Sequence, residues 1–449
     1  MKPGKTAKKF EPDETGAINY GGAVLTSSLE ENVALIKQIF ARDATVIERR
    51  VENRLRPKAR CCLFFIDGMA NNQIIDEYIV KPIVDSTTLG LKDNPIEALS
   101  RDVLVANDVR RVRAVEELVK SLIAGDTLVF AEGSSEGLVV STKGYETRAV
   151  TEPDSEKALR GPREGFTESI LVNLSLLRRK LRTPDLKMEF KTIGTRSNTR
   201  VCICYLESLT DPALLEELER RLDQIEIDGI LDSNYISELI KDAPASPFKT
   251  IGSTERPDVV AGKLLEGRIA LILDGTPMAL TLPYLFIETF QANDDYYLNC
   301  YFASISRILR IFGFLMTVSI PAVYIAFVTF HREMIPTDLA LSVMEARQGV
   351  PFPTALECFL MLIIFEIIRE TGVRMPSNIG QALSIVGALV VGQAAVEAKL
   401  VSAPMVIVVA TTAITGLINP KVKGAAILFR FIALFAASFL GLFGYAFAM

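Results

Sequence analysis

The spacing of apolar and polar positions divides the chain into a polar part and an apolar part. Up to about residue 303, short apolar runs alternate with charged segments, as in proteins that fold in water. From Ser304 to Met449, four or five apolar segments follow one another, and only 17 of the 103 Asp, Glu, Lys and Arg residues lie after position 300. This change predicts an α/β domain followed by an α-helical, multi-span membrane domain, residues 304–449.

The polar part begins with a flexible segment, residues 1–28, and a first α/β module, residues 29–150. In LEENVALIKQIF the apolar residues recur at helical spacing, and two acids lie in the first turn, where the helix dipole favours them. The runs TVIERRVE and ARCCLFFID predict strands, and Asn71–Lys81 and Val112–Ala124 predict helices. The segment DTLVFAEGSSEGLVVSTK has a Gly/Ser turn between two apolar runs and predicts a hairpin.

A second α/β module is predicted over residues 151–242. Thr167 is the expected N-cap of its first helix. LKMEFKTIG and TRVCICYLE predict strands, and PALLEELERRLDQI predicts a helix. Residues 243–303 then predict a linker, a hairpin around the Asp-Gly turn at Asp274, and an interfacial helix within Pro283–Tyr301.

Five segments of the apolar part are candidate membrane helices, namely Ile308–Phe330, Thr354–Ile368, Gly380–Glu397, Ala403–Ile418 and Gly424–Met449. Only the first and last clearly reach the roughly 20 residues that a spanning helix needs. The middle three are short, and one is rich in Gly and Ala, which allow close helix packing in lipid. We therefore expect them inside a bundle or an oligomer. A small excess of flanking basic residues favours a cytoplasmic N-terminal domain.

Composition argues against several classes of function. The net charge is −5 and no Lys/Arg cluster is dense enough to neutralise nucleic-acid phosphates, so we expect no nucleic-acid partner. One histidine and six cysteines without a CxxC pair predict no metal site, and no cofactor motif is present. The close cysteine pairs lie in apolar strands and are expected as buried, reduced thiols. The first residues contain no apolar stretch, so we expect no secretory signal.

One pattern suggests catalysis. Gly133–Gly137 matches the GxSxG motif, which would make Ser135 the nucleophile of a hydrolase. That motif needs a strand, a sharp turn and then a helix, whereas a second strand-like run follows here. The only histidine is His331, almost 200 residues away. We therefore expect a hairpin turn and no enzyme, and a hydrolase at Ser135 is the disfavoured alternative.

Polar residues within or beside the apolar segments are the candidate functional residues: Glu357, Glu366, Gln381, Gln393, Glu397 and Arg430. A charge in hydrocarbon is costly, so it normally faces a bundle interior, a water-filled path or another charge. A stripe with i, i+4, i+7 and i+11 spacing would line a pore if several copies met around an axis. It comprises Val350, Thr354, Glu357 and Met361. The alternative is a helix end that extends its Glu to water.

A patterned polar loop, HREMIPTDLALSVMEARQGVPFP, leads into this candidate pore helix. Its motif residues are His331, Glu333, Pro336, Pro351 and Pro353. Two parts of this loop, FHREMIPT and ARQGVPFP, belong to a larger set of motifs. The others are TERPD, LLEGRIALILDGTP, DDYY and IGQALSIVGALVVGQAAVEAKLVS, with SLEENVALIKQIF, FFIDGM and GPREGFTESILVNLSLLRRKL further upstream.

Through these motifs, which cover most of residues 28–445, the chain resembles the A subunit of the GerA family of spore germinant receptors. The resemblance implies a cytoplasmic two-part α/β domain joined to a membrane domain in the spore inner membrane. It also implies a transporter-like B subunit and a lipoprotein C subunit as partners. The A subunit would form a homo-oligomer that acts as a nutrient-gated channel for monovalent cations. Relatives usually continue into a polar tail beyond the position where this chain ends.

Several alternatives remain open at this stage. A stage V sporulation protein AF type accessory protein shares the architecture. A non-conducting scaffold or signal-relay subunit would pass nutrient binding to a separate channel. A solute carrier is weakened by the small number of full spans and by the absence of an obvious inverted repeat.

Overall fold

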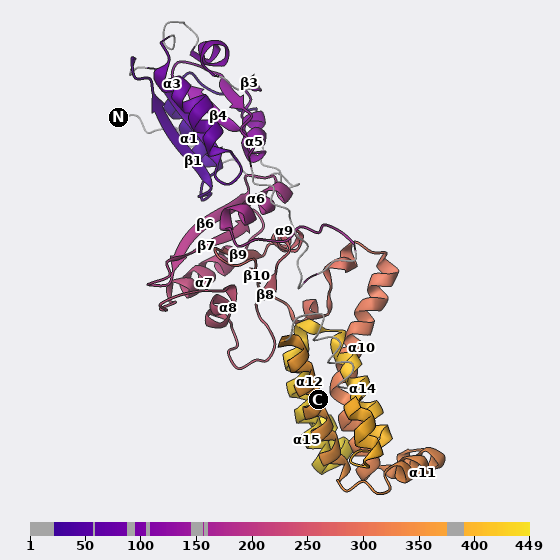
Figure 1. Ribbon diagram of the computed structural model, residues 1–449. Coiled ribbons are helices and arrows are strands. Elements are labelled where there is room, and N and C mark those ends of the chain that lie inside the picture. Colours follow the sequence, from indigo (N-terminus) through magenta and orange to yellow (C-terminus); the bar gives the residue numbers. More distant parts are fainter. Residues whose placement is uncertain are drawn as a thin grey trace. The chain divides into compact units, whose positions relative to one another are not determined.

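The computed structural model describes residues 22–56, 59–87, 95–104, 108–144, 156, 160–374 and 390–449. The chain divides into two units (Figure 1). Unit 1 runs to Pro244 and includes Thr250–Tyr284. Unit 2 comprises Ala245–Lys249 and Leu285–Met449, so the chain enters unit 2 briefly at residue 245 before it returns to complete unit 1.

The first module of unit 1 is an antiparallel sheet with the order β1-β2-β4-β5-β3. Its strands are β1 (Val46–Glu52), β2 (Arg60–Ile66), β3 (Val109–Val112), β4 (Thr127–Ala131) and β5 (Gly137–Val140). One face packs on α1 (Leu29–Ile39) and α5 (Val115–Ile123). The other packs on short helices: α2 (Asn72–Ile75), η1 (Asp76–Val80), α3 (Lys81–Asp85), α4 (Pro95–Ala98) and η2 (Leu99–Val103).

Strand β2 is apolar along its length because helices cover both faces of the sheet. Cys62 and Phe64 point into the α1/α5 core, and Cys61 and Leu63 into the opposite core. This alternation follows from the two-residue period of a strand. Burial raises the pKa of the Cys61 and Cys62 thiols to about 12, so both stay protonated at neutral pH. The prediction that these cysteines are buried is confirmed.

The second module repeats this topology with the sheet order β6-β7-β9-β10-β8. Its strands are β6 (Leu186–Ile193), β7 (Thr199–Leu206), β8 (Gly252–Thr254), β9 (Ile269–Leu273) and β10 (Ala279–Leu282). The helices α6 (Ile170–Lys180) and α9 (Pro257–Leu265) cover one face. The helices α7 (Pro212–Asp223) and α8 (Ser233–Ile240) cover the other. The inner strand β7, which lies between β6 and β9, again sends Cys202 and Cys204 into one core and Val201 and Ile203 into the other.

The two modules also share local geometry, which indicates an internal duplication that the sequence analysis missed. Asn32 of α1 holds the backbone N–H and C=O of Thr26 with its side-chain amide, at 2.9 and 2.8 Å. Asn173 of α6 holds those of Thr167 in the same way, at 2.7 and 2.6 Å. Helix α6 begins at Ile170, and its N-cap is Ser169. The prediction that Thr167 is the N-cap is wrong by two residues.

Three further predictions differ from the structure. Val112 belongs to strand β3, and helix α5 begins three residues later. The hairpin around Asp274 is β9 and β10, and it lies within the second sheet because β9 pairs with β7, so this sheet extends beyond the predicted boundary at residue 242. The predicted interfacial helix is instead two short 3-10 helices, η3 (Phe286–Phe290) and η4 (Asn293–Tyr296).

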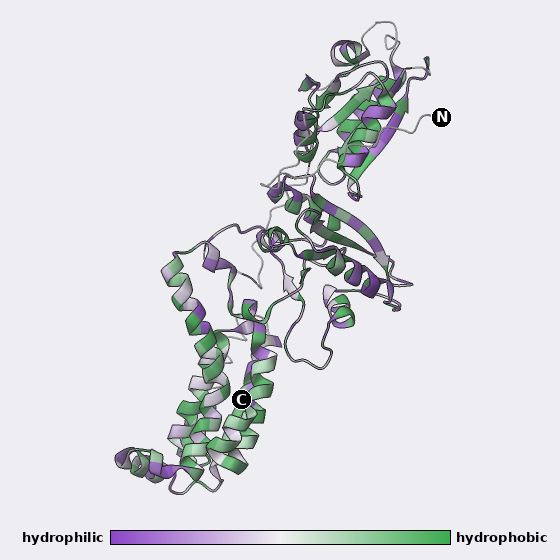
Figure 2. Ribbon diagram, turned by 180° about the vertical axis from the view of Figure 1, so that it is seen from behind, coloured by the Kyte–Doolittle hydropathy of each residue, from purple (hydrophilic) through white to green (hydrophobic). Residues whose placement is uncertain are grey.

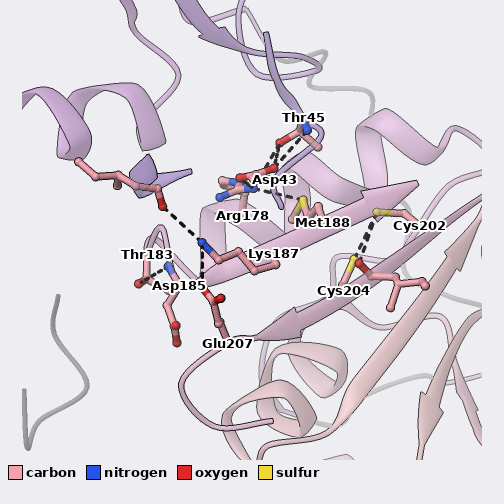
Figure 3. Close-up of polar contacts among 12 residues, drawn as sticks. Asp43, Thr45, Arg178, Thr183, Asp185, Lys187, Met188, Cys202, Cys204 and Glu207 are labelled. Atoms are coloured by element: carbon pink, nitrogen blue, oxygen red, sulfur yellow. Dashed lines mark hydrogen bonds and ion pairs between the residues drawn. The ribbon is translucent and has the colours of Figure 1, made fainter. Parts of the chain in front are cut away.

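A buried ion pair joins the two modules of unit 1 (Figure 3). The Arg178 Nη2 of α6 donates to the Asp43 Oδ2 at 2.6 Å, and the two side chains are 1% and 0% exposed. The same nitrogen lies 3.3 Å from the Thr45 hydroxyl. The Ala44 N–H donates to the Met188 carbonyl at 2.9 Å, so backbone pairing accompanies the ion pair. The module contact is therefore fixed by a charge pair that water does not reach.

Unit 2 is a bundle of apolar helices, coloured green in Figure 2. Its longest elements are α10 (Cys300–Ile325), which continues into η5 (Ala326–Phe330), α12 (Thr354–Arg374), α14 (Ala403–Leu417) and α15 (Lys423–Ala448). Shorter elements are η6 (Arg332–Met334), α11 (Thr337–Ala346), η7 (Pro420–Val422) and the helical residues 390–397. Within the part of the chain that the structure describes, two stretches are long and apolar enough to cross a membrane, Cys300–Phe330 and Pro420–Ala448. The helix α14 is apolar but shorter.

The helix α15 bends at Gly441, whose φ of 59° lies in the left-handed region that favours glycine. Beyond the bend, the Tyr445 hydroxyl forms a hydrogen bond of 2.7 Å with the Ser319 hydroxyl. The final residues therefore turn back along α10, and the straight part of α15 ends near Leu440.

We predict that Asp43→Ala lowers the stability of unit 1 strongly, because it leaves the Arg178 guanidinium buried without its counter-charge. Removing one partner of a buried pair costs roughly 3 to 5 kcal/mol. Asp76→Ala is the matched control, since the Arg49–Asp76 pair is solvent-exposed and is expected to contribute less than about 1 kcal/mol. Denaturant unfolding of the full chain in detergent measures both, and equal effects of the two substitutions would contradict the prediction.

Candidate functional site

Glu357 lies where the first turns of two helices of unit 2 meet. Its Oε1 accepts hydrogen bonds of 2.6 Å from both the backbone N–H and the hydroxyl of Ser402, the residue before α14. Its Oε2 lies 3.7 Å from the Arg347 Nη2, at the end of the polar loop. Glu357 is fully buried. The carboxylate thus connects α12, α14 and the loop at one point.

The predicted stripe runs along this buried face of α12. Thr354 and Met361 are 7% and 6% exposed, and Val350 precedes the helix and is half-buried. The Arg347 guanidinium contacts the Thr354 hydroxyl. The chain's own helices therefore cover these residues, and a pore lining made from them stays a prediction about an assembly of several copies.

The motif residues of the polar loop mainly shape its backbone. Pro336 immediately precedes α11, and Pro351 and Pro353 lead into α12, where the Pro353 carbonyl accepts from the Glu357 N–H at 3.0 Å. The His331 Nε2 accepts from the Leu442 N–H at 3.4 Å, next to the bend in α15. Glu333 is exposed. We call the end of the bundle formed by His331–Pro353 the loop end.

Two residues that the sequence analysis selected separately form one ion-pair cluster. Glu366 of α12 contacts Arg430 of α15 and Arg369 one turn further along α12. Arg430 is 2% exposed, and its guanidinium lies 5.4 Å from the centre of the Phe431 ring. This cluster links α12 to α15 in the interior of an apolar bundle, so neither charge faces hydrocarbon alone.

The remaining selected residues are Gln381, Gln393 and Glu397. Gln393 and Glu397 are exposed on the helical residues 390–397. Gln381 lies outside the described residues.

A third charge cluster, which the sequence analysis missed, lies at the opposite end of the bundle. The carboxylate of Asp295 in η4 accepts from the Arg307 Nε at 2.9 Å and from two Arg310 nitrogens at 2.8 and 3.0 Å. Burial alone would raise the pKa of Asp295, but the hydrogen bonds from Arg310 and Arg307 outweigh it and lower this pKa. The carboxylate is therefore ionised at neutral pH and holds the segment before α10 on that helix. We call this end the linker end.

A row of aromatic rings also crosses the linker end. Phe248, in the short segment where the chain enters unit 2, stacks on Phe429 of α15 with ring centres 5.5 Å apart. It meets the edge of Phe286 at 4.9 Å, and the row continues through Phe290 to Phe314 of α10. The segment predicted as part of a linker is thus attached to both candidate spans.

The described residues contain no group of three or more metal-ligating side chains. Ser135 lies in the turn between the paired strands β4 and β5, so the expected hairpin turn is confirmed.

The fold and these clusters define a class: a duplicated α/β unit joined to an apolar helical unit whose buried charges are paired within the unit. The sequence model described as "Bacillus/Clostridium GerA spore germination protein" matches residues 34–449. The chain belongs to this family, and the resemblance stated from its motifs is confirmed.

Several curated relatives are similar over most of the chain. Spore germination protein KA of Bacillus subtilis (strain 168) is 41% identical over 423 residues, which are 94% of this chain and 78% of that protein. Spore germination protein B1 of the same organism is 37% identical over 88% of this chain and 82% of its own length.

A solved structure also matches. It is the crystal structure of the N-terminal domain of the A subunit of the Bacillus megaterium spore germinant receptor GerK3. The sequence identity is 34%, and the match covers 59% of this chain and 98% of that chain, with a TM-score of 0.48.

We predict that Glu366→Gln destabilises unit 2, because it leaves two arginines without their shared counter-charge, one of them buried. A loss of roughly 3 kcal/mol is expected for a buried pair. Glu370→Gln is the matched control on the same helix, since its pair with Arg374 is exposed. Thermal unfolding in detergent, followed by helical circular dichroism, measures both. An unchanged melting temperature for Glu366→Gln would refute the prediction.

Proposed function

We propose that this chain is the A subunit of a nutrient germinant receptor in the spore inner membrane and that its helices gate a path for monovalent cations. Its relatives KA and B1 are spore germination proteins, and its family is one of spore germination proteins. Two stretches of unit 2 have the length and composition of membrane spans. The transporter-like B subunit, the lipoprotein C subunit and further copies of this chain are its proposed partners.

The proposed orientation places unit 1 on the cytoplasmic, spore-core side. Arg307, Arg310, Lys421 and Lys423 would then flank the spans on the inner side, in agreement with the positive-inside rule. The loop end, with Arg332 and Arg347, would lie on the outer side.

The position of Glu357 is the observation on which the gating proposal depends. Its carboxylate joins α12, α14 and the polar loop, so any relative movement of these elements must break the hydrogen bonds to Ser402 or the contact with Arg347. We take this arrangement as the resting state. Nutrient binding to a partner subunit would favour a second arrangement, in which this junction opens and cations pass near the carboxylate. The ligand would shift the equilibrium by the difference in its affinity for the two states.

Glu357→Gln is expected to raise cation release in the absence of nutrient by about fivefold. Glutamine keeps one acceptor for Ser402 but loses the charge, and charged hydrogen bonds exceed neutral ones by on the order of 1 kcal/mol. Glu397→Gln, an exposed acid near the same end, is the control. Potassium release from dormant spores, with and without nutrient, provides the measurement. Unchanged release in both conditions would rule out a gating role for Glu357.

We further propose that the aromatic row couples the two chain segments at the linker end to the spans, so that a displacement of these segments also displaces the spans. Phe248 lies between two passages of unit 1, at Pro244 and Thr250, and its ring contacts α15 directly. The Asp295 cluster fixes the second connection, through η4, onto α10. Displacement of either connection would therefore act on the base of a membrane span.

Phe248→Ala should weaken this coupling without unfolding either unit. Aromatic pairs contribute about 0.5 to 1.5 kcal/mol each beyond the area they bury, so the two lost pairs are expected to cost on the order of 1 to 3 kcal/mol. The nutrient concentration for half-maximal cation release should rise by about fivefold or more, which corresponds to roughly 1 kcal/mol of coupling. Phe435→Ala is the control. Among the ring pairs that the structure describes, Phe435 pairs only with Phe439, and both rings are exposed on α15. An equal effect of both substitutions would contradict the proposal.

One observation favours a second candidate function. Because Glu357 is fully buried by its own chain, the described part of α12 presents no acidic stripe to a neighbouring copy. A subunit that relays nutrient binding to a separate channel would need no such stripe. The test is to measure the ion conductance of this chain after it has been purified and reconstituted without any other candidate channel protein. Conductance would favour a conducting subunit, and its absence would favour a relay subunit.

A further inference from the structure

A cavity of about 540 Å³ opens at the loop end of unit 2. Its walls come from η5, the polar loop, α11, the start of α12 and Ser438 of α15. Most of the lining is apolar, and Val328, Val343 and Met344 are representative. The charged side chains among the lining residues are Arg332 and Arg347, and no acid lines the cavity.

The two arginines differ in how much of their hydrogen-bonding capacity is used. Arg347 is committed to Glu357 and Thr354, although its Nε is a buried donor with no partner in the structure. Arg332 is exposed, and its Nε donates to the Val328 carbonyl at 2.8 Å, which orients the guanidinium at the end of η5. This leaves the two terminal nitrogens of Arg332 as a fork of donors at the mouth of the cavity.

Helix lengths place this cavity at a boundary between hydrocarbon and water. The straight part of α15 from Lys423 to Leu440, and the continuous helix formed by α10 and η5 from Arg310 to Val328, each span about 27 Å at 1.5 Å per residue. A bilayer has a hydrocarbon core of roughly 30 Å. Charged residues therefore mark both edges of one apolar slab, and the cavity lies at the edge formed by the loop end. Headgroup phosphates occupy this level of a bilayer.

The wall formed by α11 also faces this level. None of the residues of α11 is buried, although several are large and apolar. Leu339, Leu341 and Met344 are each more than half exposed. An isolated helix with large exposed apolar side chains is stabilised when those side chains enter the interfacial region of a bilayer.

We propose that the cavity is a binding site for a phospholipid with an anionic headgroup. The phosphate is held by Arg332, with the positive charge of Arg347 behind it, and the start of one acyl chain lies against Val343 and Met344. The lipid then forms part of the packing between α11, the polar loop and α12, next to the Glu357 junction. The inference rests on the membrane location in the proposed function, but it requires no ion conduction.

The test uses the full chain, purified in detergent from vesicles that contain equal amounts of phosphatidylglycerol and phosphatidylcholine. Native mass spectrometry counts the lipid molecules retained by the wild type, Arg332→Gln, Met344→Trp and the control Lys399→Gln. Arg332 and Met344 are exposed, so neither substitution should disturb folding, and helical circular dichroism checks this. Lys399 is an exposed cation of the neighbouring segment that does not line the cavity.

The proposal predicts selective retention of phosphatidylglycerol by the wild type. Arg332→Gln should reduce the retention of phosphatidylglycerol by about fivefold, because one basic residue near an anionic lipid surface contributes roughly 1 kcal/mol. Met344→Trp, which fills the cavity, should reduce it at least as much, whereas Lys399→Gln should retain it. Equal retention by all four proteins would overturn the proposal. So would displacement of the lipid by inorganic phosphate, which would indicate a site for small anions. Neither result depends on germination, so the proposed function would be tested separately.

Discussion

The helical unit of this protein depends on one constraint: a charge within an apolar helix bundle must be paired inside the protein. Three clusters meet this requirement at different depths. Asp295 pairs with two arginines at the linker end, Glu366 pairs with Arg430 inside the bundle, and Glu357 lies between Ser402 and Arg347 at the loop end. The Glu357 and Glu366 clusters join helices that are distant in sequence, whereas the Asp295 cluster joins η4 to the following helix. The relative positions of α12, α14 and α15 are therefore specified by polar contacts as well as by apolar packing.

Such clusters are a poor way to gain stability alone, because desolvating two charges offsets much of their attraction. They do restrict the bundle to arrangements in which each charge finds a partner. A bundle with few permitted arrangements is suited to a two-state response. Because its packed helices cannot deform continuously, a displacement at one end changes the whole bundle from one arrangement to another. The same logic applies in unit 1, where the buried Arg178–Asp43 pair fixes the contact between two copies of one duplicated module.

The sequence predicted the features that depend on local pattern. The strand β2 could be predicted because a strand that is buried on both faces is an unbroken apolar run. The hairpin turn at Ser135 could be predicted because a second apolar run follows it. The duplication was missed because its apolar identities have drifted, although the turn glycines remain equivalent: Gly125 and Gly133 in the first module, Gly267 and Gly275 in the second, all with positive φ. Within the site, Glu366 and Arg430 were each selected, but their pairing joins residues 64 positions apart and leaves no local signal. Phe248 was read as part of a linker because a single aromatic residue among Pro and Ser carries no periodicity.

We propose that this chain serves a spore germinant receptor as the subunit whose helices respond to nutrient. The most direct measurement is nutrient-triggered release of monovalent cations from spores in which this chain, expressed with its partner subunits, is the only A-type subunit. The account predicts rapid release after nutrient addition when the chain is present and none when its gene is deleted. Release that is indistinguishable with and without the chain would contradict it.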